Sequence, residues 1–340
     1  GHDAALAFAG FVDGAAEVQP VAARHVLADG LDVGMLCQRL AGLLAKAMHR
    51  VENAIDIRGE DRPHLRVTFD AAMRASHNQL IAVNATGCLE VFSSPYPESA
   101  WQIPWMHSLF GNAPAVASGI AAALRAKRRD DVTVIAQGGD GATVDIGFGC
   151  LSGMFERNDD VLYLCYDNEA YMNTGIQRSG ATPPFARTNT TQAVGEHPGN
   201  PIGNGKNVPR IALAHGIPYV ATASVADLHD LERKVTKAIG VRGARYIHVH
   251  VPCPLGWGSD PAHTMKVARL AVESGLFPLF EAEFGKIICS TPIRRKVPVE
   301  RYLELQTRFK HLFGPPQDTE ALAAIQAMAD DNIAVYGLME

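Results

Sequence analysis

From about residue 79 to residue 254 the chain alternates short apolar runs with longer stretches of helical periodicity, and this alternation constrains its fold most strongly. Runs that are apolar at every position are typical of strands buried on both faces, and parallel strands need helical crossovers between them. We therefore expect an α/β fold in which a parallel sheet is covered by helices on both faces. The expected strands span residues 79–87, 131–141, 160–171, 218–225 and 245–254. The expected helices span residues 107–129, 143–157, 208–217 and 225–241.

Helical sequences flank this alternating region. Residues 31–54 place leucine and methionine on one stripe of an amphipathic helix, whereas residues 60–65 (EDRPHL) are typical of a turn. Further helical stretches are expected at 66–76, 304–313 and 318–339. We predict a helical N-terminal extension at 1–75, an α/β domain at 76–285, and a helical C-terminal extension at 286–340 that packs on the domain or on a partner.

Composition excludes several classes of function. The formal net charge of −5 gives no electrostatic case for binding nucleic acid or an anionic membrane. No apolar run approaches the ~20 residues of a membrane span. The six cysteines are scattered without any C-x-x-C pair, which argues against a disulfide framework and favours a reducing cytoplasm.

The strand at 131–141 ends in Gly138-Gly139-Asp140-Gly141, which combines a bare backbone with a carboxylate. Ligands of parallel α/β sheets lie at the carboxyl ends of strands, where glycines and a helix N-terminus favour a phosphate. A carboxylate beside a diphosphate would repel it unless a divalent cation lay between them, so Asp140 predicts a metal, with Mg²⁺ favoured. A second oxygen donor is expected from the end of the next strand, where Asp167 and Asn168 stand.

Gly139-Asp140-Gly141, followed by Asn168 after one helix and one strand, resembles the thiamine diphosphate signature. The resemblance implies that Asp140 and Asn168 bind the metal through their side chains and Ala170 through its carbonyl. It also makes Gly139 and Gly141 cofactor-binding residues. A Rossmann dinucleotide site is disfavoured because no G-x-G-x-x-G follows the first strand.

Three longer stretches narrow the family: residues 84–120 (NATGCLEVF…), 166–183 (YDNEAYMNTGIQRSGATP) and 250–258 (HVPCPLGWG). Together they resemble the thiamine-binding β subunit of 2-oxoacid:ferredoxin oxidoreductases, closest to the pyruvate type. The resemblance implies that the segment around Asn173 and Thr174 wraps the cofactor, with Asn173 catalytic. The segment Thr86-Gly87-Cys88 would pack near the cofactor.

The resemblance also implies an activity and partners. The family decarboxylates a 2-oxoacid oxidatively, pyruvate by default, to an acyl-CoA and carbon dioxide, and passes electrons to iron–sulfur carriers. An α-type subunit would supply the glutamate that contacts the aminopyrimidine, and an iron–sulfur subunit or ferredoxin would accept the electrons. The alternatives are a thiamine-dependent decarboxylase or carboligase without electron transfer, an oxidoreductase for oxalate or an aryl 2-oxoacid, and a non-catalytic assembly subunit.

The chain departs from this family in its cysteines. A [4Fe–4S] cluster needs four thiolate ligands, and the family takes two of them from an N-terminal C-x-x-C. Cys88 and Cys253 match the other two positions, but Ala5 and Phe8 stand where the pair would be. We therefore expect no cluster in this chain. The remaining cysteines are expected to be buried structural thiols: Cys37, Cys150, Cys165 and Cys289.

Four further polar residues carry open alternatives. His107 is a candidate for proton transfer or for binding the substrate carboxylate, or is a hydrogen-bonded structural histidine. Arg178 either anchors a substrate or diphosphate oxygen or lies on the surface. His248 and His250 alternate on one strand and so share a face, although a metal site there is disfavoured.

Overall fold

The computed structural model describes residues 63–93 and 103–339. The amphipathic helix expected at 31–54, Cys37, and the positions of Ala5 and Phe8 lie outside these residues. No helix in the described ranges is both long and apolar enough to cross a membrane.

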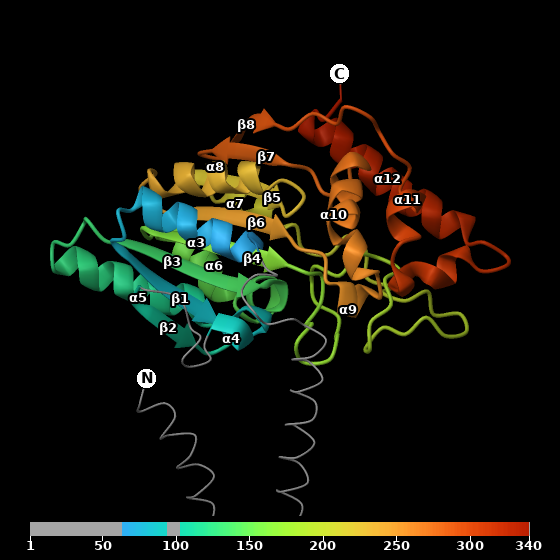
Figure 1. The fold of residues 1–340 in the computed structure, drawn as a ribbon, viewed down its shortest axis with the longest axis horizontal. Coiled ribbons are helices and arrows are strands. Elements are labelled where there is room, and N and C mark those ends of the chain that lie inside the picture. Colours follow the sequence, from blue (N-terminus) through green and yellow to red (C-terminus); the bar gives the residue numbers. More distant parts are fainter. Residues whose placement is uncertain (1–62, 94–102, 340) are drawn as a thin grey trace, which may run out of the picture. The chain divides into compact units, whose positions relative to one another are not determined.

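An eight-stranded sheet forms the centre of the described structure, with the strand order β2-β1-β3-β4-β6-β5-β7-β8 (Figure 1). The strands are β1 (Leu80–Ala85), β2 (Trp105–Ser108), β3 (Thr133–Gly139), β4 (Val161–Asp167), β5 (Tyr219–Ser224), β6 (Arg245–His250), β7 (Phe280–Glu283) and β8 (Lys286–Ser290). The six strands from β2 to β5 in this order pair in parallel. The predicted α/β fold with a parallel sheet is therefore confirmed for this larger part of the sheet.

The remaining edge differs from the prediction. β7 pairs antiparallel with β5, and β8 pairs antiparallel with β7, so the sheet is mixed. β8 also lies inside the segment expected to be a helical C-terminal extension. Cys289, expected to be a buried thiol, is exposed on this edge strand, whose residues 286–289 are all exposed.

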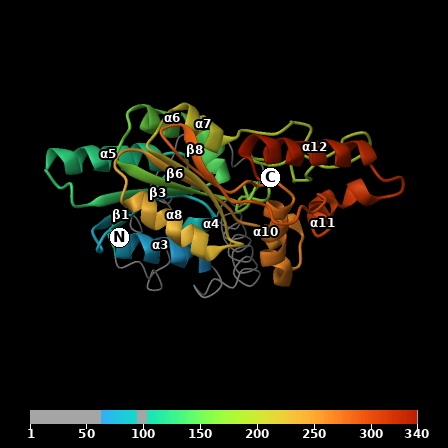
Figure 2. The same ribbon diagram turned by 90° about the horizontal axis from the view of Figure 1, so that it is seen from above.

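Helices cover both faces of the sheet, as predicted, and Figure 2 shows the two layers edge-on. One layer holds α5 (Ala113–Ala126), α6 (Phe148–Glu156) and α7 (Val208–Ala214), and the other holds α3 (Pro63–Ala75), α4 (Cys88–Ser93) and α8 (Leu228–Ile239). α3 falls within the expected N-terminal extension, yet its Phe69 and Ala72 belong to the same core cluster as β1. Arg74 of α3 also forms an ion pair with Glu232 of α8 at 2.5 Å.

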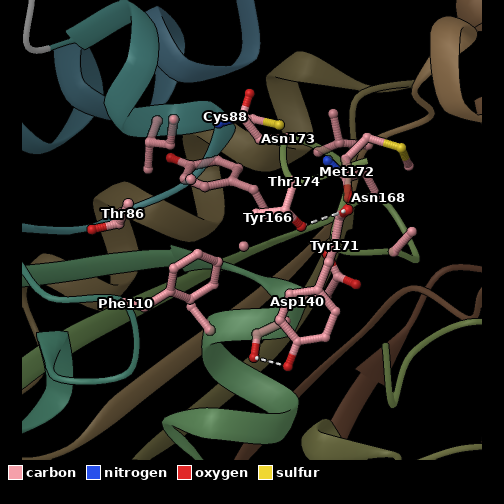
Figure 3. A pocket seen from close by; sticks show the side chains of 17 residues that line it. Thr86, Cys88, Phe110, Asp140, Tyr166, Asn168, Tyr171, Met172, Asn173 and Thr174 are labelled. Atoms are coloured by element: carbon pink, nitrogen blue, oxygen red, sulfur yellow. Dashed lines mark hydrogen bonds between the residues drawn. The ribbon is translucent and has the colours of Figure 1, made fainter. Parts of the chain in front are cut away.

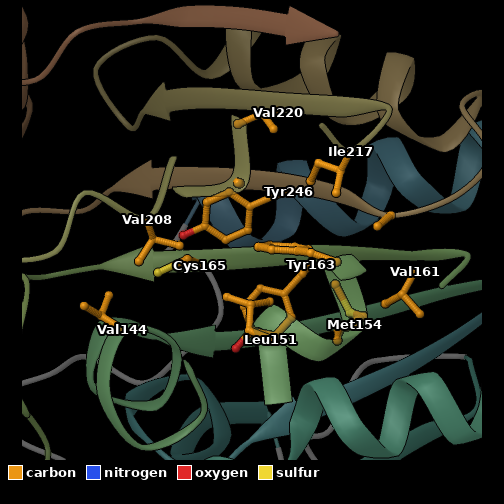
Figure 4. Packing of buried hydrophobic residues seen from close by; sticks show 14 of the residues in the cluster. Val144, Leu151, Met154, Val161, Tyr163, Cys165, Val208, Ile217, Val220 and Tyr246 are labelled. Carbon is orange, nitrogen blue, oxygen red and sulfur yellow. The ribbon is translucent and has the colours of Figure 1, made fainter. Parts of the chain in front are cut away.

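Large side chains fill the layer between the sheet and α5, α6 and α7 (Figure 4). The rings of Tyr163 on β4 and Tyr246 on β6 stack with their centroids 6.2 Å apart. Leu151 and Met154 of α6 are fully buried in the same cluster. Burial of this kind stabilises the fold by about 1.5–3 kcal/mol per large apolar side chain, and it fixes the strand ends at which ligands of such sheets bind.

The C-terminal segments pack beyond the carboxyl ends of β4 and β6 (Figure 1). They comprise α9 (Pro254–Trp257), η4 (Pro261–His263), α10 (Thr264–Glu273), α11 (Glu300–Leu303), η5 (Thr307–Phe313) and α12 (Thr319–Tyr336). Trp257 is buried at the centre of their cluster and packs edge-on against Tyr302 with the ring centroids 6.4 Å apart. The helix expected at 318–339 is α12, whereas the stretch expected at 304–313 forms the 3-10 helix η5.

Three local expectations were wrong. Residues 63–65 of the turn expected at 60–65 belong to α3, which begins at Pro63, since proline is tolerated in the first turn of a helix; residues 60–62 lie outside the described ranges. The helix expected at 107–129 is shorter: residues 105–108 form the edge strand β2, and α5 begins only at Ala113. The helix expected at 143–157 is divided into a π-helix, η3 (Gly141–Ile146), and α6.

Candidate cofactor and metal site

A pocket opens at the carboxyl ends of β1, β3 and β4, where the sequence predicted a ligand (Figure 3). It holds about 620 Å³ of empty space. The residues that the family resemblance assigns to the cofactor or the metal all line it, together with several that were not predicted, whereas Asp167 and Arg178 do not. The lining comprises Thr86, Gly87, Cys88, Leu89, Phe110, Gly139, Asp140, Gly141, Ala142, Tyr166, Asn168, Ala170, Tyr171, Met172, Asn173, Thr174 and Val251.

Asp140 directly follows β3, caps the start of η3, and is only 1% exposed. Burial raises the pKa of its carboxyl group well above the ordinary range, and the nearby Asp167 carboxylate raises it further. Ser179 partly offsets this by donating a hydrogen bond of 2.5 Å from Oγ to Oδ2. A buried carboxylate of this kind needs a positive partner to remain ionised.

The side-chain oxygen of Asn168 faces two other oxygens, 3.1 Å from Asp140 Oδ1 and 2.9 Å from the Ala170 carbonyl oxygen. Turning the amide by 180° would replace these contacts with two hydrogen bonds. With its oxygen on this side, Asn168 forms a set of three oxygens with Asp140 and Ala170, one of them from a carboxylate; with its nitrogen there, the amide donates to both. Oxygen donors of these types are the ligands that Mg²⁺ prefers, so the residues fit such a cation. Clusters of three or more His, Cys, Asp or Glu able to hold a metal are absent from the described ranges.

The glycines of the pocket serve two purposes. A Cβ atom at Gly141 would lie 2.4 Å from the ring of Tyr171, so only glycine allows that ring to pack there. Tyr171 also donates a hydrogen bond of 3.2 Å from its hydroxyl to the Gly141 carbonyl. At Gly87, which has a φ of +153°, a Cβ would meet nothing within 4 Å, and at Gly139 the nearest atom is at 3.8 Å. The backbone at 87 and 139 is thus left open to the pocket.

The loop after β4 carries Asn173 and Thr174 at its exposed tip (Figure 3). Tyr171 and Gln177 close the loop, because the Tyr171 amide donates to the Gln177 carbonyl at 2.9 Å. Thr174 Oγ1 donates to Gln177 Oε1 at 2.6 Å, and Gln177 Nε2 donates back to the Thr174 carbonyl at 2.9 Å. The loop is therefore held by its own hydrogen bonds with the Asn173 side chain left exposed.

His107 does not line the pocket, but it contacts a residue that does. Its Nε2 lies 2.8 Å from Thr86 Oγ1, and Thr86 donates to the Ser108 carbonyl at 3.2 Å. His107 is exposed on β2, where residues 106 and 107 pair with β1. Its contact with the pocket passes through Thr86.

The comparisons with known proteins agree with this geometry. The profile of the thiamine pyrophosphate enzyme, C-terminal TPP-binding domain, matches residues 85–249. Pyruvate synthase subunit PorB of Methanosarcina barkeri is 53% identical over 259 residues, which cover 76% of this chain and 87% of that protein. Ketoisovalerate oxidoreductase subunit VorB of Pyrococcus abyssi is 43% identical and covers 74% of this chain and 82% of its own.

This chain belongs to the thiamine diphosphate-binding β-subunit family of 2-oxoacid:ferredoxin oxidoreductases. The family resemblance drawn from the sequence is confirmed. A more distant likeness is found in the solved structure of 2-oxoglutarate:ferredoxin oxidoreductase from Magnetococcus marinus, at 24% identity and a TM-score of 0.47. That likeness covers 61% of this chain and 74% of the other.

The cysteines of this β subunit occupy different environments. Cys88 lines the thiamine pocket at the start of α4, whereas Cys253 precedes α9 and packs partly buried against the C-terminal cluster. Cys165 is fully buried in β4, as predicted, and Cys150 is half-buried in α6. The expectation that no cluster is held here stays a prediction.

Two other candidates have partners within the β subunit. Arg178 Nε donates to Asn200 Oδ1 at 3.1 Å, and the side chain does not line the thiamine pocket. His248 Nε2 lies 2.7 Å from Asp167 Oδ2, and its Nδ1 lies 2.6 Å from the Tyr246 hydroxyl.

Sequence reasoning missed Ser179, whose hydroxyl donates a hydrogen bond to Asp140. Ser179 stands 39 residues after Asp140, and the one feature of the sequence that could have indicated its role is that it closely follows the segment 169–175.

Proposed function

We propose that this subunit binds thiamine diphosphate through Mg²⁺ and, with its partner subunits, oxidatively decarboxylates pyruvate. The observation that carries the proposal is the position of the Asn168 side-chain amide on the pocket wall, 3.1 Å from Asp140 Oδ1 and 2.9 Å from the Ala170 carbonyl oxygen. When bound, thiamine diphosphate supplies the electron sink for loss of carbon dioxide from a 2-oxoacid. The choice of pyruvate is supported by the identity of 53% to a subunit named pyruvate synthase.

Each residue of the pocket takes a defined part in this proposal. Asp140, Asn168 and Ala170 hold the cation, which in turn neutralises the diphosphate. The open backbone at Gly87 and Gly139 permits close approach of the cofactor, and Gly141 makes room for Tyr171.

The residues at the pocket mouth orient the cofactor and act at its reacting end in this proposal. Asn173 and Thr174 project from a loop that is already closed by its own hydrogen bonds, so little ordering is needed when the cofactor binds. Asn173 is the proposed catalytic residue. His107 fixes the hydroxyl of Thr86, and it is a positioning residue in this scheme.

The partners follow from what this chain lacks. We infer that an α-type subunit contributes the glutamate for the aminopyrimidine, and that coenzyme A accepts the acyl group. Cys88 and Cys253 are fewer than the four thiolates of a [4Fe–4S] cluster, and the sequence has no C-x-x-C pair. We therefore place the iron–sulfur carriers on a partner subunit or on ferredoxin.

The test is an assay of the complex purified anaerobically with its partner subunits. Pyruvate should reduce ferredoxin or methyl viologen only when thiamine diphosphate, Mg²⁺ and coenzyme A are all present. Asn173→Ala should abolish this reduction without weakening cofactor binding, while Arg125→Ala, on the exposed face of α5, should leave it unchanged. Reduction that is indifferent to thiamine diphosphate, or a complex that turns over only other 2-oxoacids, would contradict the proposal.

A further inference from the structure

A second cavity lies beside the thiamine pocket, on the other side of the segment that follows β4. It spans about 1630 Å³ of empty space, part of it open to solvent, between the carboxyl ends of β4, β5 and β6 and the helices α10, α11 and α12. The chain bends after β4, with Glu169 at a φ of +62°, and the side chains on the two sides of this bend face different spaces. Asn168 and Ala170 line the thiamine pocket, whereas Asp167 and Glu169 line the second cavity.

The two carboxylates of this second cavity that follow from β4, Asp167 and Glu169, have basic partners within the chain. Asp167 pairs with His248 at 2.7 Å, and Glu169 pairs with Arg308 at 2.5 Å. Arg308 is itself buried and lies over the ring of Trp257, 3.8 Å from its centroid. The cavity therefore offers no uncompensated carboxylate for a cation at this end.

His250 is a buried group of the cavity without a hydrogen bond among the residues described. It is 1% exposed, and its ring lies between Phe277 and Trp257, with centroids 4.7 Å and 5.6 Å away. Its Nε2 lies 3.6 Å from Glu169 Oε1, beyond hydrogen-bond distance, and neither ring nitrogen has a hydrogen-bond partner among the residues described. A buried imidazole left in this state costs about 1–3 kcal/mol, which a ligand carrying a hydrogen-bonding group would recover.

Arg210 provides a cation on the α7 side of the same cavity. Within the described part of the chain its guanidinium forms no ion pair or hydrogen bond, and the residue is exposed. Lys206, by contrast, is engaged by the Val144 carbonyl and by Asp145, each at 2.9 Å. The buried Tyr336 also lines this side of the cavity. Asp331, an exposed acidic residue of α12, lines it as well.

Apolar side chains form the walls between these polar groups. They are Leu276, Phe277, Phe280, Leu303, Phe309 and Ile325. Ligand sites in proteins combine apolar walls of this kind with a few fixed polar groups. A guanidinium binds a carboxylate through two parallel hydrogen bonds.

We propose that this cavity is a second ligand site, for an amphipathic carboxylate with an aliphatic body. Its carboxylate binds Arg210 beside Tyr336, its body contacts the apolar walls, and a hydroxyl or carbonyl at the inner end bonds to His250. The site is separate from the thiamine pocket, so its occupation does not depend on Asp140 or on Mg²⁺.

The test is calorimetric titration of the full chain with octanoate, 8-hydroxyoctanoate and 1-octanol. Octanoate should bind with one site per chain and more tightly than octanol. Arg210→Gln should weaken octanoate binding about 10-fold, which is the value of one charge-assisted hydrogen bond. Arg125→Gln, which also removes an exposed arginine but lies outside the cavity, should bind octanoate as the unmodified chain does.

A second pair of titrations tests the inner end. The unmodified chain should bind 8-hydroxyoctanoate several-fold more tightly than octanoate, and His250→Phe should remove this preference while the thermal melt shows that the variant is folded. Asp140→Ala should retain octanoate binding, which separates this site from the thiamine pocket. The proposal is overturned if octanoate shows no saturable binding at millimolar concentration, or if Arg210→Gln binds it as tightly as Arg125→Gln.

Discussion

Buried oxygens on the two sides of the segment from Asp167 to Ala170 have different kinds of partner. On the side of the second cavity, Asp167 and Glu169 each have a basic partner from elsewhere in the chain, His248 and Arg308. Burial alone would raise the pKa of Glu169. The interactions of its carboxylate with Arg308 and His250 have the larger combined effect and hold the pKa below its ordinary range.

On the side of the thiamine pocket, the Asp140 carboxylate contacts the Asn168 amide and the Ser179 hydroxyl, and none of the described residues that line the pocket is basic. Burial raises the pKa of Asp140 well above its ordinary range. The fold thus gives Asp167 and Glu169 basic partners. Asp140, where a cation is expected to bind, has no basic partner among the residues that line the pocket. The predictions below change one side at a time.

The largest effect is expected from Arg308→Met, on the neutralised side. Removing the arginine leaves the Glu169 carboxylate buried without its cation, and breaking a buried pair in this way costs about 3–5 kcal/mol of unfolding free energy. Denaturant unfolding measures the loss, and Arg187→Met, which removes an exposed arginine, is the control. A loss below about 1 kcal/mol would show that Glu169 does not depend on Arg308.

Asp140→Asn, in the thiamine pocket, should weaken cofactor binding without lowering the stability of the fold. The affinity for thiamine diphosphate with Mg²⁺ should fall at least about 100-fold. The unfolding free energy without ligands should not fall, because the variant replaces a buried carboxyl group that has no basic partner among the residues lining the pocket. Calorimetry and denaturant unfolding measure the two quantities, with the exposed Asp130→Asn as control. Unchanged cofactor affinity would exclude Asp140 as a metal ligand.

Much of this comparison could be predicted from the sequence, but only on one side. Asp140 and Asn168 stand at the ends of β3 and β4, two strands that are apolar throughout, and adjacent parallel strands bring their carboxyl ends together. Arg308 reaches Glu169 across 139 residues, after the C-terminal segments fold back. No periodicity or spacing encodes that contact, because it depends on tertiary packing of α9 to α12.

The same reasoning explains which elements of the fold were missed. β1 and β3 to β6 were predictable because each is buried on both faces. The edge strands β2 and β8 expose much of their length, so they lack the apolar run that marks a central strand. The π-helix η3 has the apolar character of an α-helix, and its different hydrogen bonding leaves no mark on the sequence.

Ser179→Ala should have an intermediate effect on the thiamine side. The hydroxyl donates to Asp140 Oδ2, and its loss removes a hydrogen bond that orients the carboxylate. We expect thiamine diphosphate affinity with Mg²⁺ to fall about 10-fold, since partners that orient a metal ligand have effects of this size. Ser118→Ala, on α5 and outside the pocket, should leave the affinity unchanged. An effect as large as that of Asp140→Asn would assign Ser179 a direct role in binding.

The smallest effect is expected from His107→Gln. His107 is exposed and reaches the pocket only through Thr86, so glutamine can replace its hydrogen bond in part. The rate of pyruvate-dependent electron transfer by the complex should fall about 3-fold, in line with a single solvent-exposed hydrogen bond. A fall of about 100-fold or more, the size of general acid–base catalysis, would make His107 a catalytic residue instead.

The most direct measurement of the central claim is a crystal structure of the chain with thiamine diphosphate and Mn²⁺, which replaces Mg²⁺ and scatters anomalously. We predict one anomalous peak in the thiamine pocket, within about 2.0–2.4 Å of Asp140 Oδ1, Asn168 Oδ1 and the Ala170 carbonyl oxygen, with the diphosphate completing its coordination. A cofactor bound without a peak at these three oxygens, or an Asn168 amide turned to donate hydrogen bonds to the other two, would contradict the account.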